Sequence, residues 1–125
     1  MDLSKPNNLN ATELSTLRTI IHNIHAQNRN AGWWDKPREV GTMLCMVHSE
    51  VSEAMEGARK GINDDHLTHR PMLEVELADA VIRIFDMAGG LNLDVAGAIS
   101  EKLAYNANRA DHKRENRGKD GGKRF

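Results

Sequence analysis

The sequence predicts an all-α protein, a four-helix bundle-like subunit that we expect oligomerisation to complete. Apolar residues recur at spacings of three and four along four segments, as they do on one face of a helix. No run of residues looks like a strand, and turn-forming residues separate the four segments, so short loops should join the helices. A chain of 125 residues has the size of a single domain, 1–125.

The composition excludes several classes of protein. Lys and Arg number 17 against 18 Asp and Glu, and this net charge of -1 argues against a protein that coats polyanions through its overall charge. The single cysteine, Cys45, excludes an intrachain disulfide framework and the usual multi-cysteine zinc sites. No apolar stretch approaches the roughly 20 residues that span a bilayer, and the first residues lack the apolar segment of a signal peptide. We therefore expect a cytoplasmic protein with no membrane partner.

The first two helices are expected after a loose leader, residues 1–10. Asn10 and Glu13 form a capping-box variant that opens a helix over about 11–29. A second helix is expected over about 37–60, because the proline at its start is tolerated in the first turn of a helix.

The third expected helix, about 72–88, is apolar in nearly every direction around its axis. We expect such a helix to lie centrally, with its polar stripe facing an interior site. Gly89-Gly90 is expected to end it, and Asp94 to cap a fourth helix over about 95–110. The polar stripe consists of Glu76, Asp79, Arg83 and Asp86.

The end of the chain is basic and rich in glycine. Residues 109–125 hold seven bases and three acids, a net charge of +4, and we expect 111–125 to form a flexible tail. A nucleic-acid-binding module that uses this tail is one alternative function, and its affinity would fall steeply with salt. Residues 50–79 oppose that alternative, because they hold eight acids against three bases.

Two pairs of acidic residues are the most informative pattern. Glu50-x-x-Glu53 lies in the second helix and Glu76-x-x-Asp79 in the third, and residues three apart share one face of a helix. Antiparallel packing of the two helices would gather four carboxylates, which cannot all stay ionised at close quarters without a cation. Oxygen ligands in that number suit Mg²⁺ or Mn²⁺ better than zinc or copper. A solvated helix face is the alternative, which a single pair would not exclude.

A di-iron carboxylate bundle is the rival metal hypothesis. That design needs Glu-x-x-His on two helices, and no glutamate here has a histidine three residues later. Nucleophilic catalysis is not indicated either, because Cys45 and the serines lack a recognisable base partner.

One stripe of the fourth helix carries cationic and hydrogen-bonding groups. Such groups suit phosphate oxygens, and a solvated face is the alternative. Carboxylates that hold Mg²⁺ beside bases that hold phosphate would form a site for a polyphosphate substrate. The stripe holds Lys102, Asn106 and Arg109, with Tyr105 on the same side.

Trp33 and Trp34 lie in the connection between the first two helices rather than in an apolar stripe. An indole stacks on a nucleobase with roughly 1–3 kcal/mol per base. The alternative is a hydrophobic lid over one end of the bundle, and one tryptophan could serve each purpose.

Together these motifs resemble the MazG-like family of all-α nucleoside triphosphate pyrophosphohydrolases. The family signature is Glu-x-x-Glu, a spacer and Glu-x-x-Asp, and here the 22 residues 54–75 separate the two pairs. The resemblance covers about residues 20–125. It is strengthened by Gly32-Trp33-Trp34, by Tyr105-Asn106-x-x-Arg109 and by Gly121-Gly122-Lys123.

The resemblance implies an enzyme that hydrolyses a nucleoside triphosphate, ribo- or deoxy-, between the α and β phosphates. The products are the monophosphate and pyrophosphate, and housecleaning of the nucleotide pool is the expected role. A homodimer or homotetramer is implied, with helices of one copy completing the sites of another. The implied ligands of Mg²⁺ are Glu50, Glu53, Glu76 and Asp79; Lys102, Asn106 and Arg109 would contact phosphate, and Tyr105 the base or sugar.

The general base is the open point of this comparison. Some relatives carry a further acid just before the first motif glutamate, where this chain has Ser49. Glu56, one turn beyond Glu53, is a possible substitute, so the expected catalytic set is Glu50, Glu53 and Glu56. A non-catalytic sensor bundle that binds nucleotide and metal without turnover is the main alternative, and only Ser49 favours it.

Overall fold

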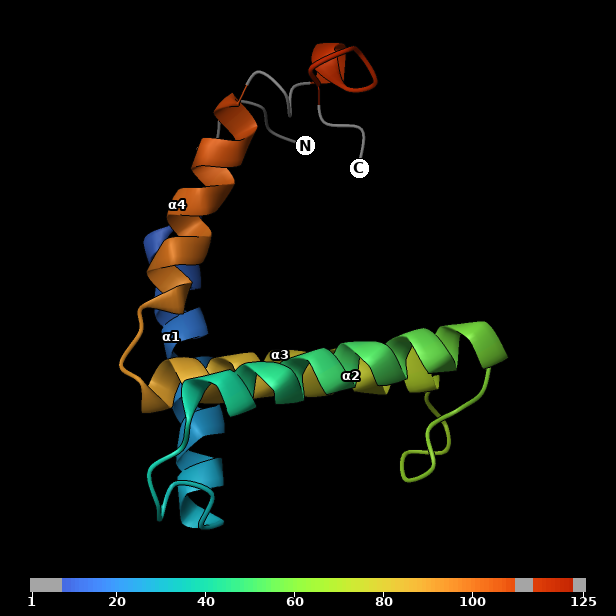
Figure 1. The fold of residues 1–125 in the computed structure, drawn as a ribbon. Helices are drawn as coiled ribbons and strands as arrows, with labels where there is room; N and C mark the ends of the chain where they lie inside the picture. Colours follow the sequence, from blue (N-terminus) through green and yellow to red (C-terminus); the bar gives the residue numbers. More distant parts are fainter. Residues whose placement is uncertain (1–7, 110–113, 123–125) are drawn as a thin grey trace. The chain divides into compact units, whose positions relative to one another are not determined.

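The computed structural model describes residues 8–109 and 114–122 and is all-α, as predicted (Figure 1). The described residues contain no strand beyond an isolated bridge between Asn63 and Pro71. The elements in chain order are α1 (Ala11–Asn30), α2 (Val40–Lys60), α3 (Met72–Gly90), α4 (Val95–Asn108) and the short 3₁₀ helix η1 (Arg114–Asn116).

The chain groups into two compact units, which we describe separately. The first combines the stretch up to Thr19 with the stretch from Asp94 onward, and the second runs from Ile20 to Leu93. The second unit therefore contains α2, α3 and the latter part of α1. Residues 1–7 of the expected leader, and residues 110–113 and 123–125 of the expected flexible tail, lie outside the described residues.

The start of α1 confirms the predicted capping box. The backbone N–H of Glu13 donates to Oδ1 of Asn10 at 2.8 Å, and the N–H of Asn10 donates to Oε1 of Glu13 at 3.0 Å. These bonds satisfy backbone groups that the first turn of a helix leaves without partners. The end of the expected leader is also held, because the N–H of Leu9 donates to Oγ of Ser100 at 3.1 Å.

α2 begins at Val40, three residues later than expected. Glu39 is the N-cap: its extended backbone precedes the helix, and its carboxylate accepts hydrogen bonds from the N–H groups of Gly41 and Thr42 at 2.7 and 2.6 Å. A proline is therefore not the first helical residue, since a side-chain cap further along sets the boundary. The helix ends at Lys60 as predicted, followed by Gly61 in the left-handed conformation with φ 62°.

α3 corrects the expectation that Gly89-Gly90 ends the helix at residue 88, because both glycines lie inside it. A β-carbon at position 89 would lie 2.6 Å from Cβ of His25, and one at position 90 would overlap the ring of Trp34. The glycines are therefore places where other segments pack closely against the helix backbone, and helical propensity gives way to packing.

α4 begins as predicted, with Asp94 as its N-cap and the N–H of Gly97 donating to Oδ1 of Asp94 at 3.0 Å. The same carboxylate accepts a hydrogen bond from Arg18 of α1 at 3.0 Å, and these bonds lower the pKa of Asp94. The helix ends at Asn108, slightly before the expected residue 110.

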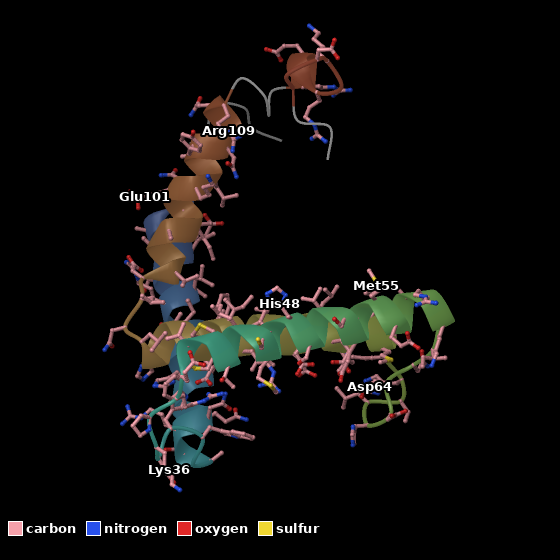
Figure 2. All side chains as sticks on the ribbon, in the orientation of Figure 1. Lys36, His48, Met55, Asp64, Glu101 and Arg109 are labelled. Atoms are coloured by element: carbon pink, nitrogen blue, oxygen red, sulfur yellow. The ribbon has the colours of Figure 1, made fainter. Side chains whose placement is uncertain are left out.

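α2 and α3 lie side by side as a helical hairpin, which forms the main body of the second unit (Figure 1). The two helices pack closely at Gly57, where a β-carbon would lie 2.9 Å from both the backbone nitrogen of Leu73 and Cβ of Met72. In the connecting loop, which Figure 2 marks at Asp64, that carboxylate accepts hydrogen bonds from the N–H groups of His66 and Leu67.

The buried core of the chain is small, while many large apolar side chains of the hairpin are exposed. Met55, for example, is 65% exposed and projects from the same side of α2 as His48 (Figure 2). None of the described helices has the combination of length and apolar character that crossing a bilayer requires. The buried apolar residues are Ile21, Met43, Ala54, Ala80, Met87, Ala88 and Ala96; the exposed ones on the hairpin include Leu44, Val51, Met55, Leu73, Leu77 and Val81.

Candidate metal centre

Three of the four carboxylates that the paired acidic motifs predict to gather lie together in the hairpin, and Glu53 is not among them. One oxygen from each of Glu50, Glu76 and Asp79 lies within 4.8 Å of the other two. Glu50 comes from the middle of α2, and the other two lie three residues apart on α3, which places them on one face of that helix. Oxygen atoms at this separation can share one hard divalent cation.

Glu76 is the most strongly perturbed member of the cluster. Its side chain is buried at 8% exposure, and Oε2 has no hydrogen-bond partner among the described residues. Burial, followed by the neighbouring carboxyl groups of Glu50 and Glu53, raises the pKa of Glu76 to about 8. A buried oxygen without a partner is costly, and a cation would both satisfy it and favour its ionised form. The residues present therefore fit a divalent metal ion.

Asp79 is influenced by the same surroundings. Burial is the main cause that raises its pKa, the charge of Glu50 adds to the effect, and the guanidinium of Arg83 opposes it. Arg83 also donates from Nε to Oε1 of Glu50 at 2.7 Å, which links α3 to α2 within the cluster. The expected inward-facing stripe of α3 is confirmed, since Glu76 and Asp86 are buried and Asp79 and Arg83 are partly buried.

The remaining acidic candidates of α2, Glu53 and Glu56, are not among the three clustered acids. Glu53 is exposed and lies close enough to Glu76 to raise its pKa. Glu56 pairs with Lys60 at 2.7 Å on the surface of α2. Ser49, which occupies the position of the further acid, is exposed and donates to the carbonyl of Met46 at 2.7 Å. The roles of Glu53 and Glu56 as proton acceptors stay predictions.

A cavity of about 230 Å³ opens beside the carboxylates, within the second unit. Two of the three clustered acids line one part of it, and the indole of Trp33, which is 62% exposed, lines another. Both polar and apolar side chains therefore face the same space. The lining residues are Asn28, Trp33, Arg38, Met43, Met46, Glu50, Asp79, Ile82, Arg83 and Asp86.

Trp34 has a different environment from its neighbour. Its indole N–H donates to Oδ1 of the buried Asp86 at 2.9 Å, and its ring lies edge-on to His25 with centroids 5.1 Å apart. Nδ1 of His25 lies 2.9 Å from the same Oδ1, and Nη1 of Arg38 donates to Oδ2 at 3.3 Å. Asp86 thus joins α3 to α1 and to the α1–α2 connection.

This network around Asp86 was not predicted from the sequence. Asp86 continues the polar stripe of α3, and that spacing was a usable signal for its burial. Its partners come from segments 48 to 61 residues away in the chain, and neither a capping motif nor helical periodicity relates residues at such separations. The base or sugar contact proposed for Trp34 stays a prediction.

The candidate phosphate-binding residues lie in the first unit, Lys102 and Asn106 on α4 and Arg109 at its C-cap. Nζ of Lys102 lies 4.6 Å from the centroid of the Tyr105 ring, and Cζ of Arg109 lies 5.6 Å from it. Oδ1 of Asn106 is buried without a hydrogen-bond partner among the described residues. The predicted stripe is therefore present as a cluster of two cations around one aromatic ring, near the end of α4 that Figure 2 marks at Arg109.

Comparisons with protein-family models, with curated proteins and with solved structures find no match to this chain. The resemblance to the MazG-like family accordingly depends on the motifs of the sequence, and the metal centre on the geometry of Glu50, Glu76 and Asp79.

Proposed function

We propose that this chain is a Mg²⁺-dependent nucleoside triphosphate pyrophosphohydrolase that also accepts Mn²⁺. The observation that carries the proposal is the buried, unpartnered Oε2 of Glu76 inside a cluster with Glu50 and Asp79. Isolated acidic residues on a helix surface have water as their partner, whereas this oxygen lacks any partner among the described residues. The motif spacing that resembles the MazG-like family then selects the reaction class.

Within this proposal, the three clustered carboxylates would hold the cation, which would lower the pKa of bound water and neutralise phosphate charge, whereas Glu53, a fourth ligand by resemblance, lies outside the cluster. In the proposed reaction, water attacks the α phosphorus. The bond from this phosphorus to the α–β bridging oxygen breaks, and pyrophosphate leaves. The proton of the water passes to a carboxylate. Glu53 is our candidate acceptor, because it is exposed to solvent beside the buried acids.

The cavity next to the cluster supports a substrate with both anionic and aromatic parts. Glu50 and Asp79 line it beside the arginines at positions 38 and 83, and the exposed indole of Trp33 offers a stacking surface. We assign the base or sugar to Trp33 on this ground. The assignment of Lys102, Asn106 and Arg109 to phosphate, and of Tyr105 to the base or sugar, rests on the resemblance alone.

We also propose that the chain associates with copies of itself through the α2–α3 hairpin. Leu77 and Val81, one turn apart on α3, are 49% and 45% exposed, and further apolar residues of α2 are similarly uncovered. Exposed apolar area of this extent on two packed helices is typical of a surface that another helix layer covers. A dimer or a tetramer would provide that layer.

Product analysis tests the proposed reaction. Purified protein and Mg²⁺ are incubated with a panel of ribo- and deoxynucleoside triphosphates, with and without a chelator. We expect monophosphate and pyrophosphate, no turnover with the chelator, and no turnover by Glu76→Gln. The matched control is Glu101→Gln, an exposed glutamate of α4 (Figure 2) whose replacement should leave the rate unchanged.

Two other outcomes would contradict the proposal. Diphosphate and orthophosphate as products would mean that the bond cleaved is the wrong one. Binding of Mg²⁺ and triphosphate without turnover of any nucleotide would instead favour the sensor function.

A further inference from the structure

Arg83 places a cation within the carboxylate cluster. Its Nε donates to Oε1 of Glu50 at 2.7 Å, and the two side chains are 33% and 11% exposed. Arg83 lies one turn after Asp79 on α3, and its charge counteracts the raised pKa of that group. The guanidinium therefore offsets part of the negative charge that a divalent cation would otherwise balance.

The guanidinium uses one of its donor groups in this contact. Arginine has five N–H donors arranged as a planar fork. Its Nη1 and Nη2 make no hydrogen bond within the part of the chain that the structure describes, and Arg83 lines the cavity together with Glu50 and Asp79. Donors that remain available beside a cavity can bind an anionic group that enters it.

A divalent cation bound to Glu50 would weaken the contact between Glu50 and Arg83. The metal and the guanidinium would repel each other, and both would use the carboxylate of Glu50. A phosphate group brought into the cavity would give the released fork an anionic partner of matching geometry, since guanidinium binds phosphate through two parallel hydrogen bonds. Nothing else on α3 could make this contact, because its neighbours in the stripe are acids.

We propose that Arg83 exchanges partners during binding: it pairs with Glu50 in the free protein and with a phosphate oxygen of the substrate in the metal-bound complex. This inference rests on the proposed function and adds a phosphate-contacting residue to it. It makes a prediction that a purely structural ion pair does not make. Removal of the guanidinium should strengthen binding of the metal alone and weaken binding of the metal–triphosphate complex.

The experiment compares wild type with Arg83→Gln and Arg83→Lys. Binding of Mn²⁺ alone is measured by electron paramagnetic resonance, and binding of an α,β-imido nucleoside triphosphate with Mg²⁺ by calorimetry. For Arg83→Gln we expect Mn²⁺ to bind several-fold more tightly and the analogue at least ten-fold more weakly. Arg83→Lys keeps the charge and loses the fork, so Mn²⁺ affinity should stay near wild type while the analogue still binds more weakly. Arg59→Gln, on the exposed end of α2, is the control and should change neither affinity.

The outcomes separate this inference from the proposed function. If wild type binds both ligands and the two Arg83 variants bind the analogue as tightly, or bind Mn²⁺ more weakly, the exchange of partners is wrong and the proposed function stands. If wild type binds neither Mn²⁺ nor the analogue, the proposed function fails and the inference fails with it. Should Arg83→Gln not fold, the Arg83→Lys result alone decides.

Discussion

The indole N–H of Trp34 donates to Oδ1 of Asp86 at 2.9 Å and thereby fastens the α1–α2 connection to the buried side of α3. Asp86 is 4% exposed and accepts from three side chains, so its carboxylate is a hub for the second unit. The adjacent Gly90 leaves the space that the indole ring occupies. Trp34 therefore has a structural role: it holds Asp86, which lines the cavity together with Trp33.

We predict that Asp86→Ala lowers the free energy of unfolding by roughly 3 kcal/mol, because it leaves three donors in a buried region without their acceptor. Trp34→Phe keeps the ring and removes a single hydrogen bond, so its cost should be about 1 kcal/mol. Urea unfolding of both variants measures the two values. A Trp34→Phe variant that is less stable than Asp86→Ala would contradict the role of Asp86 as the hub.

Trp33 should matter for binding and little for stability. Its side chain is mostly exposed, so Trp33→Ala is expected to change the free energy of unfolding by less than about 0.5 kcal/mol. Loss of base stacking, worth roughly 1–3 kcal/mol, should raise KM by about 5- to 150-fold. Steady-state kinetics with the preferred triphosphate measure this change. An unchanged KM would remove Trp33 from the base subsite.

Glu76→Gln should abolish turnover and raise the stability of the metal-free protein. The variant replaces a buried acid by a neutral group of the same shape, and we expect it to lose Mn²⁺ binding and turnover. Without metal, at about pH 8.5, it should be more stable than wild type by several kcal/mol, because the raised pKa of Glu76 makes its ionisation in the folded state costly and one pKa unit corresponds to about 1.4 kcal/mol. Thermal and chemical unfolding with a chelator test this. A variant less stable than wild type under these conditions would show that the Glu76 carboxylate stabilises the metal-free fold.

The stability of the metal-free protein should depend on pH through Glu76. Its pKa is about 8 in the folded chain against an ordinary value of 4.5. Between these values the folded state retains a proton that the unfolded state has released, so the free energy of unfolding falls as pH rises through this window. Below pH 4.5 both states are protonated and the effect is absent; above about pH 8 it is complete.

The measurement is the difference in unfolding free energy between wild type and Glu76→Gln across pH 4 to 9 with a chelator. This difference removes the contributions of groups that do not interact with Glu76. Saturating Mg²⁺ should reduce the slope, because the cation favours ionised Glu76. A difference that does not vary with pH would show that Glu76 has an ordinary pKa.

Charged substitutions on the hairpin should disrupt self-association. Leu77→Lys and Val81→Lys place a cation on the apolar surface that we expect a second copy to cover, and they should yield monomers with little turnover. Sedimentation equilibrium gives the oligomeric state. Leu67→Lys, an exposed apolar position in the α2–α3 loop, is the control and should leave the association unchanged. A wild type that is monomeric at all concentrations would contradict this interface.

The parts of the structure that sequence patterns predicted depend on neighbours in the chain. Asn10 with Glu13, and Asp94 at the start of α4, act over three residues, so their motifs sufficed. The convergence of the acids needed only two helical faces and one short loop. By contrast, Gly89 and Gly90 appeared to end a helix, because the close approach of His25 and Trp34 that requires them is a tertiary contact.

The pair of Arg83 and Glu50 shows the same limit at the candidate site. Helical spacing placed Arg83 on the polar stripe, yet its partner depends on how far α3 is shifted along α2. Helical periodicity predicts which residues share a face of one helix, but it does not predict how far one helix is shifted along another.

The close contact of Gly57 with the start of α3 limits how far α3 can shift along α2. Its missing side chain lets the start of α3 meet α2, and a methyl group at this position would displace Met72 and Leu73. A rigid helix would transmit a small displacement to Glu76, one turn further on, and to Asp79, about two turns further on. Mg²⁺ at the proposed site would require oxygen atoms near 2.0–2.1 Å in nearly ideal octahedral geometry. Ca²⁺ tolerates longer and less regular bonds. The close contact at Gly57 would thus affect how well the proposed site distinguishes one alkaline-earth ion from another.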